Sequence, residues 1–429
     1  MHSVVSKVLR VIKPSKTELK RELNFCDILL FRIRPHIPPG CEVVLTGSMA
    51  KKTFLHDKKD IDIFVLFDRS VPKTEFEPTI KKIISECFPN IHYQLSYAEH
   101  PYARFKFEGR RIDLVPAYKI SSAAERLSAV DRSVLHTSFI KKTLIKEKID
   151  DVLLLKKFFH AHSLYGAEIK IKGFSGYLCE LLVIHYGSFQ NLLKHASKWK
   201  KPIFIDVKKY YKKSEINDAI KRFGFFVVID PTDKNRNVSA AVSEENFLAF
   251  RKLAIQFLKK PSELFFFKNV PTFEEKIKKA AKGKKAILVS LPKPDVVDDV
   301  LWGQVYKMTG QLKAHLEEFE TTIIADDHKH LIRLAIIASK DKLPPKMLVE
   351  GPPLNMKEHI VKFKKNHKKA KFIVKKKKIY AEVNRKIIKI ENAIMEFFKQ
   401  FGKSPSHLAC SEELLIIERM STKPHKTKK

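Results

Sequence analysis

The segment GSMAKKTFLHDKKDIDIF, residues 47–64, constrains this chain more than any other part of its sequence. It predicts a Gly-Ser turn and then a strand over residues 60–67, in which Asp60 and Asp62 begin an apolar run. Because side chains two residues apart on a strand project from the same face, the two carboxylates should lie together. Aspartate is depleted from strand interiors unless it has a partner, and a hard divalent cation such as Mg²⁺ is a suitable one.

The turn and a third acid extend this pattern. Gly47 lets another group approach the backbone closely, the N–H groups that follow can line an anion nest, and Ser48 adds a hydroxyl donor. Asp113 is the central acid of a second short apolar strand, residues 111–115. If the two strands are neighbours, three carboxylates meet beside a phosphate-binding turn, which is typical of a nucleotidyl-transfer site. An Asp-x-Asp pair on a solvated strand edge is the simpler alternative.

The order Gly-Ser, Asp-x-Asp and a lone strand aspartate about fifty residues later resembles the nucleotidyltransferase superfamily of DNA polymerase beta. Four stretches are similar to the archaeal-type, class I CCA-adding enzymes: YAEHPYARF (97–105), RIDLVPAY (111–118), YGAEIKIKGFSGYLCELL (165–182) and VVIDPTDKNRNVSAA (227–241). The similarity runs from about residue 15 to about residue 355 and is specific in roughly the first 245. It implies a CCA tRNA nucleotidyltransferase, which adds and repairs the 3′-terminal CCA of tRNA without a template, using CTP and ATP and releasing pyrophosphate.

The resemblance also implies a role for individual residues. Asp60, Asp62 and Asp113 would be the catalytic carboxylates and would hold two Mg²⁺ ions. Several relatives have Glu in place of Asp60, and either acid can bind magnesium. The nucleotide-binding positions are those of Gly47, Ser48, Lys51, His136, Lys156, Tyr165 and Arg236. In the family the arginine at this last position helps to read the incoming base.

Four of these residues also have a purely structural alternative. Lys156 could lay its stem along an apolar helix face, and His136 could be an ordinary surface histidine. Tyr165 precedes Gly166 at an expected helix end and could be a capping aromatic. Arg236 could be a turn residue that follows Asp230-Pro231.

The net charge of the chain favours a nucleic-acid partner. Its 83 lysines and arginines exceed its 48 aspartates and glutamates by 35, and such an excess attracts a polyanion. Genome bias or ion-pair networks for high temperature explain many lysines but not this imbalance. The family resemblance makes the partner tRNA, whose acceptor stem and TΨC arm the basic C-terminal half would grip through shape and phosphates.

Two rival functions share the same motifs. A poly(A) polymerase or another polymerase-beta-like RNA nucleotidyltransferase would use the same palm with a different acceptor. A catalytically dead RNA-binding protein would keep the fold, although all three carboxylates and the Gly-Ser turn are intact here. The sequence leaves open whether the enzyme adds all of CCA or only its A.

The hydrophobic periodicity and the positions of prolines, glycines and capping residues predict an α+β multidomain chain. We expect a polymerase-beta-like palm over residues 1–140, a mostly helical central domain over 141–270, an RNA-recognition-like α/β body and tail over 271–415, and a basic disordered tail over 416–429. A capping box over residues 15–18 should start a helix that runs to about Arg34. A lysine-rich boundary over 276–285, turns at the proline pairs 344–345 and 352–353, and a helix over 385–401 complete the prediction.

Composition excludes several other classes of protein. No apolar stretch approaches the roughly 20 residues of a membrane span, and no signal-peptide core is present, so we expect a cytoplasmic protein. The five scattered cysteines form no Cys-x-x-Cys pair and argue against zinc and against a disulfide framework. A homodimer is one open alternative for the oligomeric state.

Overall fold

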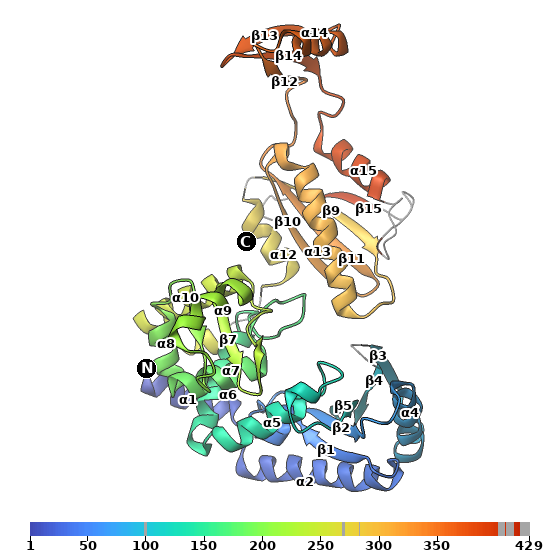
Figure 1. Cartoon of the computed structure of the whole chain (residues 1–429), viewed down its shortest axis with the longest axis vertical. Helices are drawn as coiled ribbons and strands as arrows, with labels where there is room; N and C mark the ends of the chain where they lie inside the picture. The colour runs from blue at the N-terminus through green and yellow to red at the C-terminus, as the bar shows by residue number, and fades with distance from the viewer. Residues whose placement is uncertain (98–100, 268–270, 283, 402–407, 409–415, 421–429) are drawn as a thin grey trace, which may run out of the picture. The chain divides into compact units, whose positions relative to one another are not determined.

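A computed structural model describes residues 1–97, 101–267, 271–282, 284–401, 408 and 416–420 (Figure 1). The chain divides into two compact units, Met1–Val270 and Pro271–Lys429. Both contain helices and strands. Among the residues described, no helix combines the length and the apolar character that crossing a membrane requires.

The first unit is built around a five-stranded sheet with the order β1-β2-β5-β4-β3. Its strands are β1 (Glu42–Thr46), β2 (Asp60–Phe67), β3 (Tyr93–Tyr97), β4 (Pro101–Phe107) and β5 (Arg110–Tyr118). The neighbours β2 and β5 are parallel, whereas the other pairs are antiparallel. The two strands predicted around the acids, over residues 60–67 and 111–115, are present as β2 and within β5.

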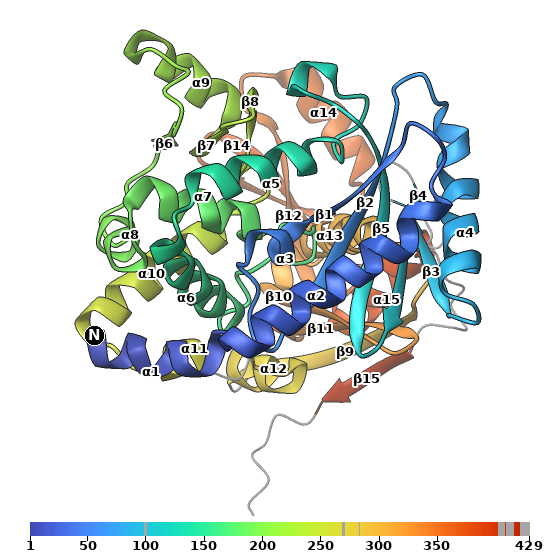
Figure 2. The same cartoon turned by 90° about the horizontal axis from the view of Figure 1, so that it is seen from below.

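Strand alternation divides this sheet into a buried face and a functional face. Ile61, Ile63 and Val65 of β2 pack under α2 (Lys16–Ile33) and α4 (Phe76–Cys87), which cover one face (Figure 2). On the other face, Phe64 and Leu66 pack against Val134 of α5 (Arg132–Thr143). Asp60 and Asp62 share this second face, because they alternate with the isoleucines.

The N-terminal helices differ from the prediction in two respects. The Ser15 hydroxyl accepts a hydrogen bond from the backbone N–H of Glu18, so α2 begins as expected. The Glu18 carboxylate does not complete a capping box, because it contacts His56 at 2.7 Å and Lys59 at 2.7 Å. A further helix, α1 (His2–Ile12), was not predicted and packs on α6 (Ile149–His160).

The remainder of the first unit is mostly helical around an aromatic core. Its helices are α6, α7 (Gly176–Tyr186), α8 (Phe189–Ala196), α9 (Ile216–Phe223), α10 (Glu244–Lys259) and α11 (Leu264–Phe267). A small sheet has the order β6 (Ile203–Ile205), β7 (Phe226–Asp230) and β8 (Asp233–Asn237), and every residue of β7 is buried. Phe159, Phe174 and Phe250 are fully buried and stack together in the core.

The second unit contains an antiparallel sheet with the order β10-β11-β9-β15. Its strands are β9 (Lys285–Pro292), β10 (Thr321–His328), β11 (Leu331–Ala338) and β15 (Ile416–Met420). Helices α13 (Asp298–His315) and α15 (Ile390–Phe401) share one apolar core with the sheet. Helix α12 (Phe273–Ala281) packs on the opposite face through Phe273 and Ile277. An RNA-recognition domain stacks bases on an open sheet face, whereas helices cover both faces of this sheet.

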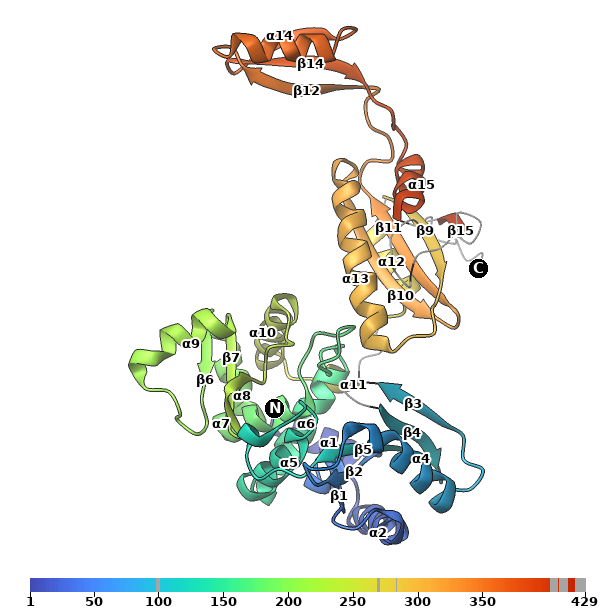
Figure 3. The ribbon, with the colours of Figure 1, turned by 45° about the vertical axis from the view of Figure 1, so that its right-hand side comes forward.

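A separate three-stranded sheet follows within the same unit (Figure 3). It has the order β12 (Lys346–Pro353), β14 (Lys378–Asn384) and β13 (Lys371–Lys375), and α14 (Lys357–Asn366) packs against β12. The prolines at 352–353 therefore end a strand, and the basic run after residue 362 is a helix and a strand. The strand signal was hidden because lysines at 371 and at 375–378 flank the short apolar centre of β13, so that the segment resembled a solvated basic run.

Three further predictions for the second unit need correction. The lysine-rich boundary is largely α12, whose apolar Phe273, Ile277 and Ala281 recur at helical spacing among the lysines. Helix α15 begins at Ile390, because the residues before it pair through their backbones with residues 342–345: the Arg385 N–H donates to the Pro345 oxygen, and Lys389 forms a bridge with Lys342. Residues 416–420 form β15 and are not part of a tail, and residues 421–429 lie outside the described residues.

The short elements complete the list. A single-turn helix, α3 (Gly47–Lys51), follows β1. The 3₁₀ turns are η1 (Arg34–His36), η2 (Lys73–Glu75), η3 (Ala123–Glu125), η4 (Lys146–Lys148), η5 (Lys213–Glu215) and η6 (Glu317–Phe319).

The packing of α12 predicts the effect of two substitutions on this helix. Ile277→Ala should lower the free energy of unfolding by about 2–4 kcal/mol, because it leaves a cavity under the sheet. Lys279→Ala, on the exposed side of the same helix, should change it by less than about 0.5 kcal/mol. Urea unfolding monitored by circular dichroism measures both, and equal midpoints for the two variants would contradict a structural role of α12.

Candidate active site

The three predicted carboxylates lie on two neighbouring parallel strands. Asp62 of β2 is in register with Asp113 of β5, and Asp60 is in register with Arg111. Neighbouring strands are about 4.8 Å apart, so all three acids project from one small area of the sheet. The prediction that the strand of Asp113 pairs beside the strand of Asp62 is therefore confirmed.

Gly47 brings the phosphate turn against this acidic area. Its φ is +66°, a conformation that side-chain-bearing residues rarely adopt. A Cβ atom at this position would lie 1.8 Å from Oδ2 of Asp62. The glycine is thus required twice, once for the backbone turn and once for the close approach of the Asp62 carboxylate.

Arginines neutralise two of the three acids. Arg104 of β4 binds Asp113 through Nε at 2.8 Å and Nη2 at 2.7 Å, and Arg111 binds Asp60 through Nη2 at 2.6 Å. Burial, together with the charges of Asp113 and Asp60, raises the pKa of Asp62 to about 6 against the opposing effect of Lys51. The area therefore holds negative charge in excess of what its arginines compensate.

This donor set fits a hard divalent cation. As the side chains stand, no three His, Cys, Asp or Glu groups among the described residues converge closely enough to hold a metal ion. The reason is visible in the ion pairs, because Arg104 and Arg111 draw Asp113 and Asp60 to themselves. Both arginines are more than a third exposed, at 38% and 45%, so a cation can replace them at little cost. Carboxylate oxygens are the ligands that Mg²⁺ prefers.

A buried cluster of two lysines, a threonine and a glutamate adjoins the turn. Lys51 of α3 donates to Glu180 of α7 at 2.6 Å. Lys156 of α6 donates to the backbone oxygen of Thr53 at 2.9 Å and to its hydroxyl at 3.0 Å, and lies 3.4 Å from Glu180. Lys156 is only 3% exposed, so its side chain does not lie along the helix face with its amine in water. Burial lowers the pKa of Lys156, and the charge of Glu180 opposes that change.

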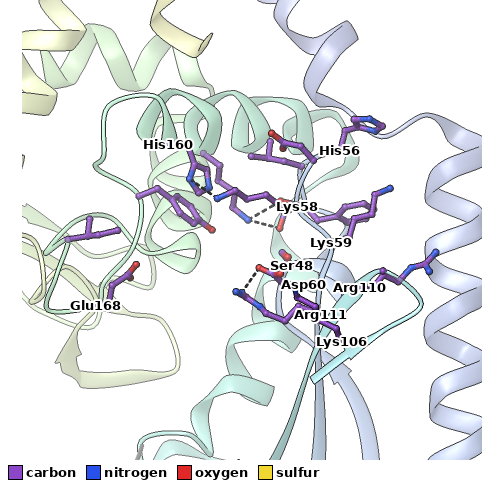
Figure 4. A pocket seen from close by; sticks show the side chains of 18 residues that line it. Ser48, His56, Lys58, Lys59, Asp60, Lys106, Arg110, Arg111, His160 and Glu168 are labelled. Atoms are coloured by element: carbon purple, nitrogen blue, oxygen red, sulfur yellow. Dashed lines mark hydrogen bonds and ion pairs between the residues drawn. The ribbon is translucent and has the colours of Figure 1, made fainter. Parts of the chain in front are cut away.

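A pocket of about 840 Å³ opens beside this cluster (Figure 4). Of the predicted site residues, Ser48, Asp60, Lys156 and Tyr165 line it. Its wall is strongly basic, with contributions from Lys58, Lys59, Lys106, Arg110 and Arg111. The size and the charge of this pocket suit a polyanionic ligand.

Tyr165 lies in this pocket and not at a helix cap. It follows the end of α6, forms an isolated bridge with Phe174 and stacks on His160 with ring centroids 4.0 Å apart. Burial and the nearby charge of Lys58 lower the pKa of His160 to about 3, so its ring is neutral at physiological pH. His160 therefore contacts Tyr165 as a neutral ring at physiological pH.

His136 and Arg236 meet at a buried carboxylate that we did not single out from the sequence. Asp230, at the end of β7, binds Nε2 of His136 at 2.8 Å, Nη1 of Arg236 at 2.8 Å and the Tyr177 hydroxyl at 3.1 Å. His136 stacks on Tyr177 with centroids 4.1 Å apart. Despite burial, His136 and Arg236 hold the pKa of Asp230 well below its usual value. His136 is therefore no ordinary surface histidine, and Arg236 lies in β8, not in the turn.

Four functional candidates were missed at the sequence level: Glu180, Asp230, Tyr177 and Arg104. Tyr177 and Glu180 lie inside the stretch GFSGYLCELL, and Asp230 lies inside VVIDPTDKNRN. The sequence showed that these stretches are family-like, but it did not show which residue each acid or ring would face.

Three stretches of the chain match known protein families. Residues 30–149 match the nucleotidyltransferase domain, and residues 150–267 match the second domain of tRNA nucleotidyltransferases. Residues 282–408 match the C-terminal domain of CCA-adding enzymes. Together with the mixed α+β structure, these matches confirm the predicted fold class.

Curated relatives cover most of the chain. The CCA-adding enzyme of Methanocaldococcus jannaschii is 38% identical over 413 residues, which are 93% of this chain and 90% of that protein. The CCA-adding enzyme of Methanosarcina mazei is 36% identical over 400 residues, 88% of this chain and 85% of that protein. Among solved structures, Cid1 poly(U) polymerase with bound MgGTP covers 62% of this chain and 98% of its own, with 15% identity and a TM-score of 0.49.

The raised pKa of Asp62 predicts that Asp62→Asn stabilises the metal-free protein at neutral pH. An acid whose pKa is raised by folding makes the folded state lose stability as pH rises from about 4 to about 6, where it ionises. Asparagine removes that loss, so we expect a gain of about 1–2 kcal/mol at pH 7 that disappears near pH 4.

Urea unfolding in the presence of a chelator, repeated between pH 4 and pH 7.5, measures this difference. Asp68→Asn is the control, because hydrogen bonds from Ser70 lower the pKa of Asp68 and its neutralisation should not stabilise the protein. A gain in unfolding free energy for Asp62→Asn that stays constant with pH would contradict the raised pKa of Asp62.

Proposed function

The chain belongs to the archaeal-type CCA-adding enzymes, tRNA nucleotidyltransferases that add the 3′-terminal CCA of tRNA from CTP and ATP, and on this premise we propose how its residues divide the work. The proposal is carried by one observation: Asp62 pairs in register with Asp113, and its carboxylate lies against Gly47 of the phosphate turn. The reacting hydroxyl and the triphosphate can therefore meet at one place. The rival functions predicted from the palm alone are set aside by the near full-length matches.

We assign the metal-binding role to Asp60, Asp62 and Asp113. Two Mg²⁺ ions held there would supply the Lewis acid that lowers the cost of deprotonating the tRNA 3′-hydroxyl and neutralises the departing pyrophosphate. Asp113 is the acid nearest the attacking hydroxyl in this assignment. Arg104 and Arg111 keep Asp113 and Asp60 paired before the nucleotide arrives.

The triphosphate would occupy the basic pocket beside the turn. Ser48 and Tyr165 line this pocket and offer hydroxyl donors, and Lys156 of α6 lines it and offers positive charge. Lys51 of α3 does not line the pocket but is joined to Lys156 through Glu180, and it adds a second positive charge beside the turn. In-line attack on the α-phosphate needs the chain of phosphates to be held still, so these residues contribute chiefly by positioning.

The base of the incoming nucleotide would meet the group around Asp230. Arg236 is 32% exposed and uses Nη1 for Asp230, so the rest of its five-donor fork is directed elsewhere. His136 and Tyr177 provide a stacked pair of rings beside it. An arginine held by a buried carboxylate is a preorganised donor for the acceptor atoms of a base.

The second unit would bind the tRNA through its phosphates. A cavity of about 660 Å³ in the three-stranded sheet is lined by Lys346, Lys365, Lys368, Lys369 and Lys371. This concentration of lysine suits the backbone of an A-form duplex, and we propose the acceptor stem and TΨC arm as its ligand. A tRNA substrate also supports a cytoplasmic location.

The metal assignment predicts that Asp113→Ala abolishes CMP and AMP incorporation. We expect a loss of at least about a thousandfold, because the reacting hydroxyl loses its nearest metal ligand. The far-UV circular dichroism and the affinity for tRNA should be unchanged. Glu42→Ala is a matched control, since it removes an ion-paired carboxylate, the partner of Lys119, from the same sheet. Activity of Asp113→Ala within tenfold of the parent would exclude the assignment.

The base-reading role predicts that Arg236→Ala impairs nucleotide choice more than triphosphate binding. Loss of a charge-assisted hydrogen bond to the base costs about 1.5–3 kcal/mol, which is about tenfold to a hundredfold in incorporation efficiency. Labelled CTP and ATP compete on tRNAs that end before and after the second C. Lys234→Ala removes an exposed charge from the same strand and should leave the choice intact. If Arg236 merely braces the turn, its loss lowers thermal stability while nucleotide choice survives at every step.

A further inference from the structure

Glu180 is a fully buried carboxylate for which the proposed mechanism has no use. It lies in α7 with 0% exposure and binds three partners from outside that helix. Lys51 donates to it at 2.6 Å, the Thr53 hydroxyl donates at 2.7 Å, and Lys156 lies at 3.4 Å. We call these four residues the lysine–glutamate cluster.

The charges of the lysine–glutamate cluster are unbalanced. It contains two ammonium groups and one carboxylate, and the two lysines are 8% and 3% exposed. A buried cation without a partner tends to lose its proton, because the charged form is poorly solvated. One carboxylate is shared by both lysines, so the cluster is one unit positive when its three groups are in their usual ionised forms.

The geometry also indicates which contact a phosphate can replace. The three donors of the Lys156 ammonium are occupied by the Thr53 backbone oxygen at 2.9 Å, the Thr53 hydroxyl at 3.0 Å and Glu180 at 3.4 Å. The contact to Glu180 is the longest and hence the weakest of the three. Thr53 therefore fixes the direction of the amine, while the third donor is available for exchange.

Lys156 lies where the triphosphate is proposed to bind, and Lys51 lies between that place and the acids. Lys156 lines the basic pocket together with Tyr165, and a Cβ atom on Gly176 would approach both side chains, at 3.6 Å from Nζ and 2.7 Å from the hydroxyl. Lys51 lies near enough to Asp62 for its charge to lower the pKa of that acid.

We propose that Glu180 is a positioning residue for the incoming nucleotide, which keeps Lys51 and Lys156 charged and directed toward the triphosphate without touching it. This inference rests on the proposed function in one respect, namely that the two lysines bind the triphosphate. Glu180 makes no contact with a base, so it serves CTP and ATP equally. Glu180 also joins α7 to the phosphate turn, because its partners are Lys51 of α3 and Thr53, which lies just after α3.

The proposal has a consequence for the pH dependence of nucleotide binding. Burial lowers the pKa of Lys156, and the negative charge of Glu180 raises it again. Without Glu180, the amine would lose its proton at a lower pH, so affinity would fall as pH rises. The titratable or charged groups that face the cluster from other positions are Asp62, His136, His160, Tyr165, Tyr177 and Cys179.

The test compares Glu180→Gln with Glu180→Asp in the full chain. The dissociation constants of CTP and ATP, each with Mg²⁺, are measured by titration calorimetry between pH 6.5 and pH 9. For Glu180→Gln we expect affinity to fall about tenfold to a hundredfold at pH 8.5, by the same factor for both nucleotides, and by less than about fivefold at pH 6.5. Glu180→Asp keeps the charge, so its smaller loss of affinity should not vary with pH.

Two further variants separate charge from packing. Thr53→Ala removes the hydroxyl that holds both Lys156 and Glu180 but leaves every charge, so affinity should fall by a factor that is constant with pH. Asp151→Asn changes a carboxylate in the first turn of α6 that accepts a hydrogen bond from the Phe189 backbone N–H at 2.9 Å, and it should not alter affinity. If Glu180→Gln does not fold, the pH-independent losses in Glu180→Asp and Thr53→Ala carry the test.

The outcomes distinguish this inference from the proposed function. If Lys156→Met leaves CTP affinity unchanged, the triphosphate assignment itself is wrong. If Lys156→Met weakens binding while Glu180→Gln has the affinity of the parent at every pH, the role of Glu180 is wrong. A Glu180→Gln loss that is constant with pH, or that differs between CTP and ATP, also overturns it.

Discussion

The site depends on the parallel pairing of β2 with β5. That register puts Asp62 beside Asp113 and turns both toward the sheet face that α2 and α4 leave uncovered. The apolar residues between them, Ile61 and Ile63, are held in the core on the other face. A shift of one residue would bury the acids and expose the isoleucines, so the hydrophobic core of the palm itself enforces the position of the acids.

Charge at the site is managed by partners that can be exchanged. Arg104 and Arg111 compensate Asp113 and Asp60 from the solvent side, whereas Asp62 has a pKa raised by burial and by its acidic neighbours. Opposite these acids, Glu180 compensates two buried lysines. The negative charge of the acids attracts a cation, and the positive charge of the lysines attracts phosphate. Binding of a metal–nucleotide complex would satisfy both sets at once.

The same contacts hold two family domains together within the first unit. Lys51 and Thr53 belong to the stretch that matches the nucleotidyltransferase domain, while Lys156 and Glu180 belong to the second-domain match. Their hydrogen bonds are buried, so they are strong and costly to leave unmade. The residues that we propose to bind the nucleotide are thus also residues that fix the two domains to each other. A change in this polar joint is expected to be felt in substrate affinity.

Much of the palm was determined by the sequence alone. Alternation of aspartate and isoleucine in residues 60–65 predicted the strand, its buried face and its acidic face, because side-chain period on a strand is two. The family-like stretches predicted the α+β class and the positions of Lys156 and Tyr165, both of which line the basic pocket. Local signals failed where lysine masks periodicity, as in α12 and β13, since long lysine stems cover apolar surface while their amines stay in water.

Only the tertiary structure decided which charges meet. Asp113 is paired with Arg104, Lys51 with Glu180, and Arg236 with Asp230, and the second of these pairs is separated by 129 positions in the chain. Spacing along a sequence predicts which face a side chain occupies, but not which distant element packs against that face. The pKa shifts of Asp62, Lys156 and Asp230 depend on burial and on those partners, and both quantities exist only after the elements have packed.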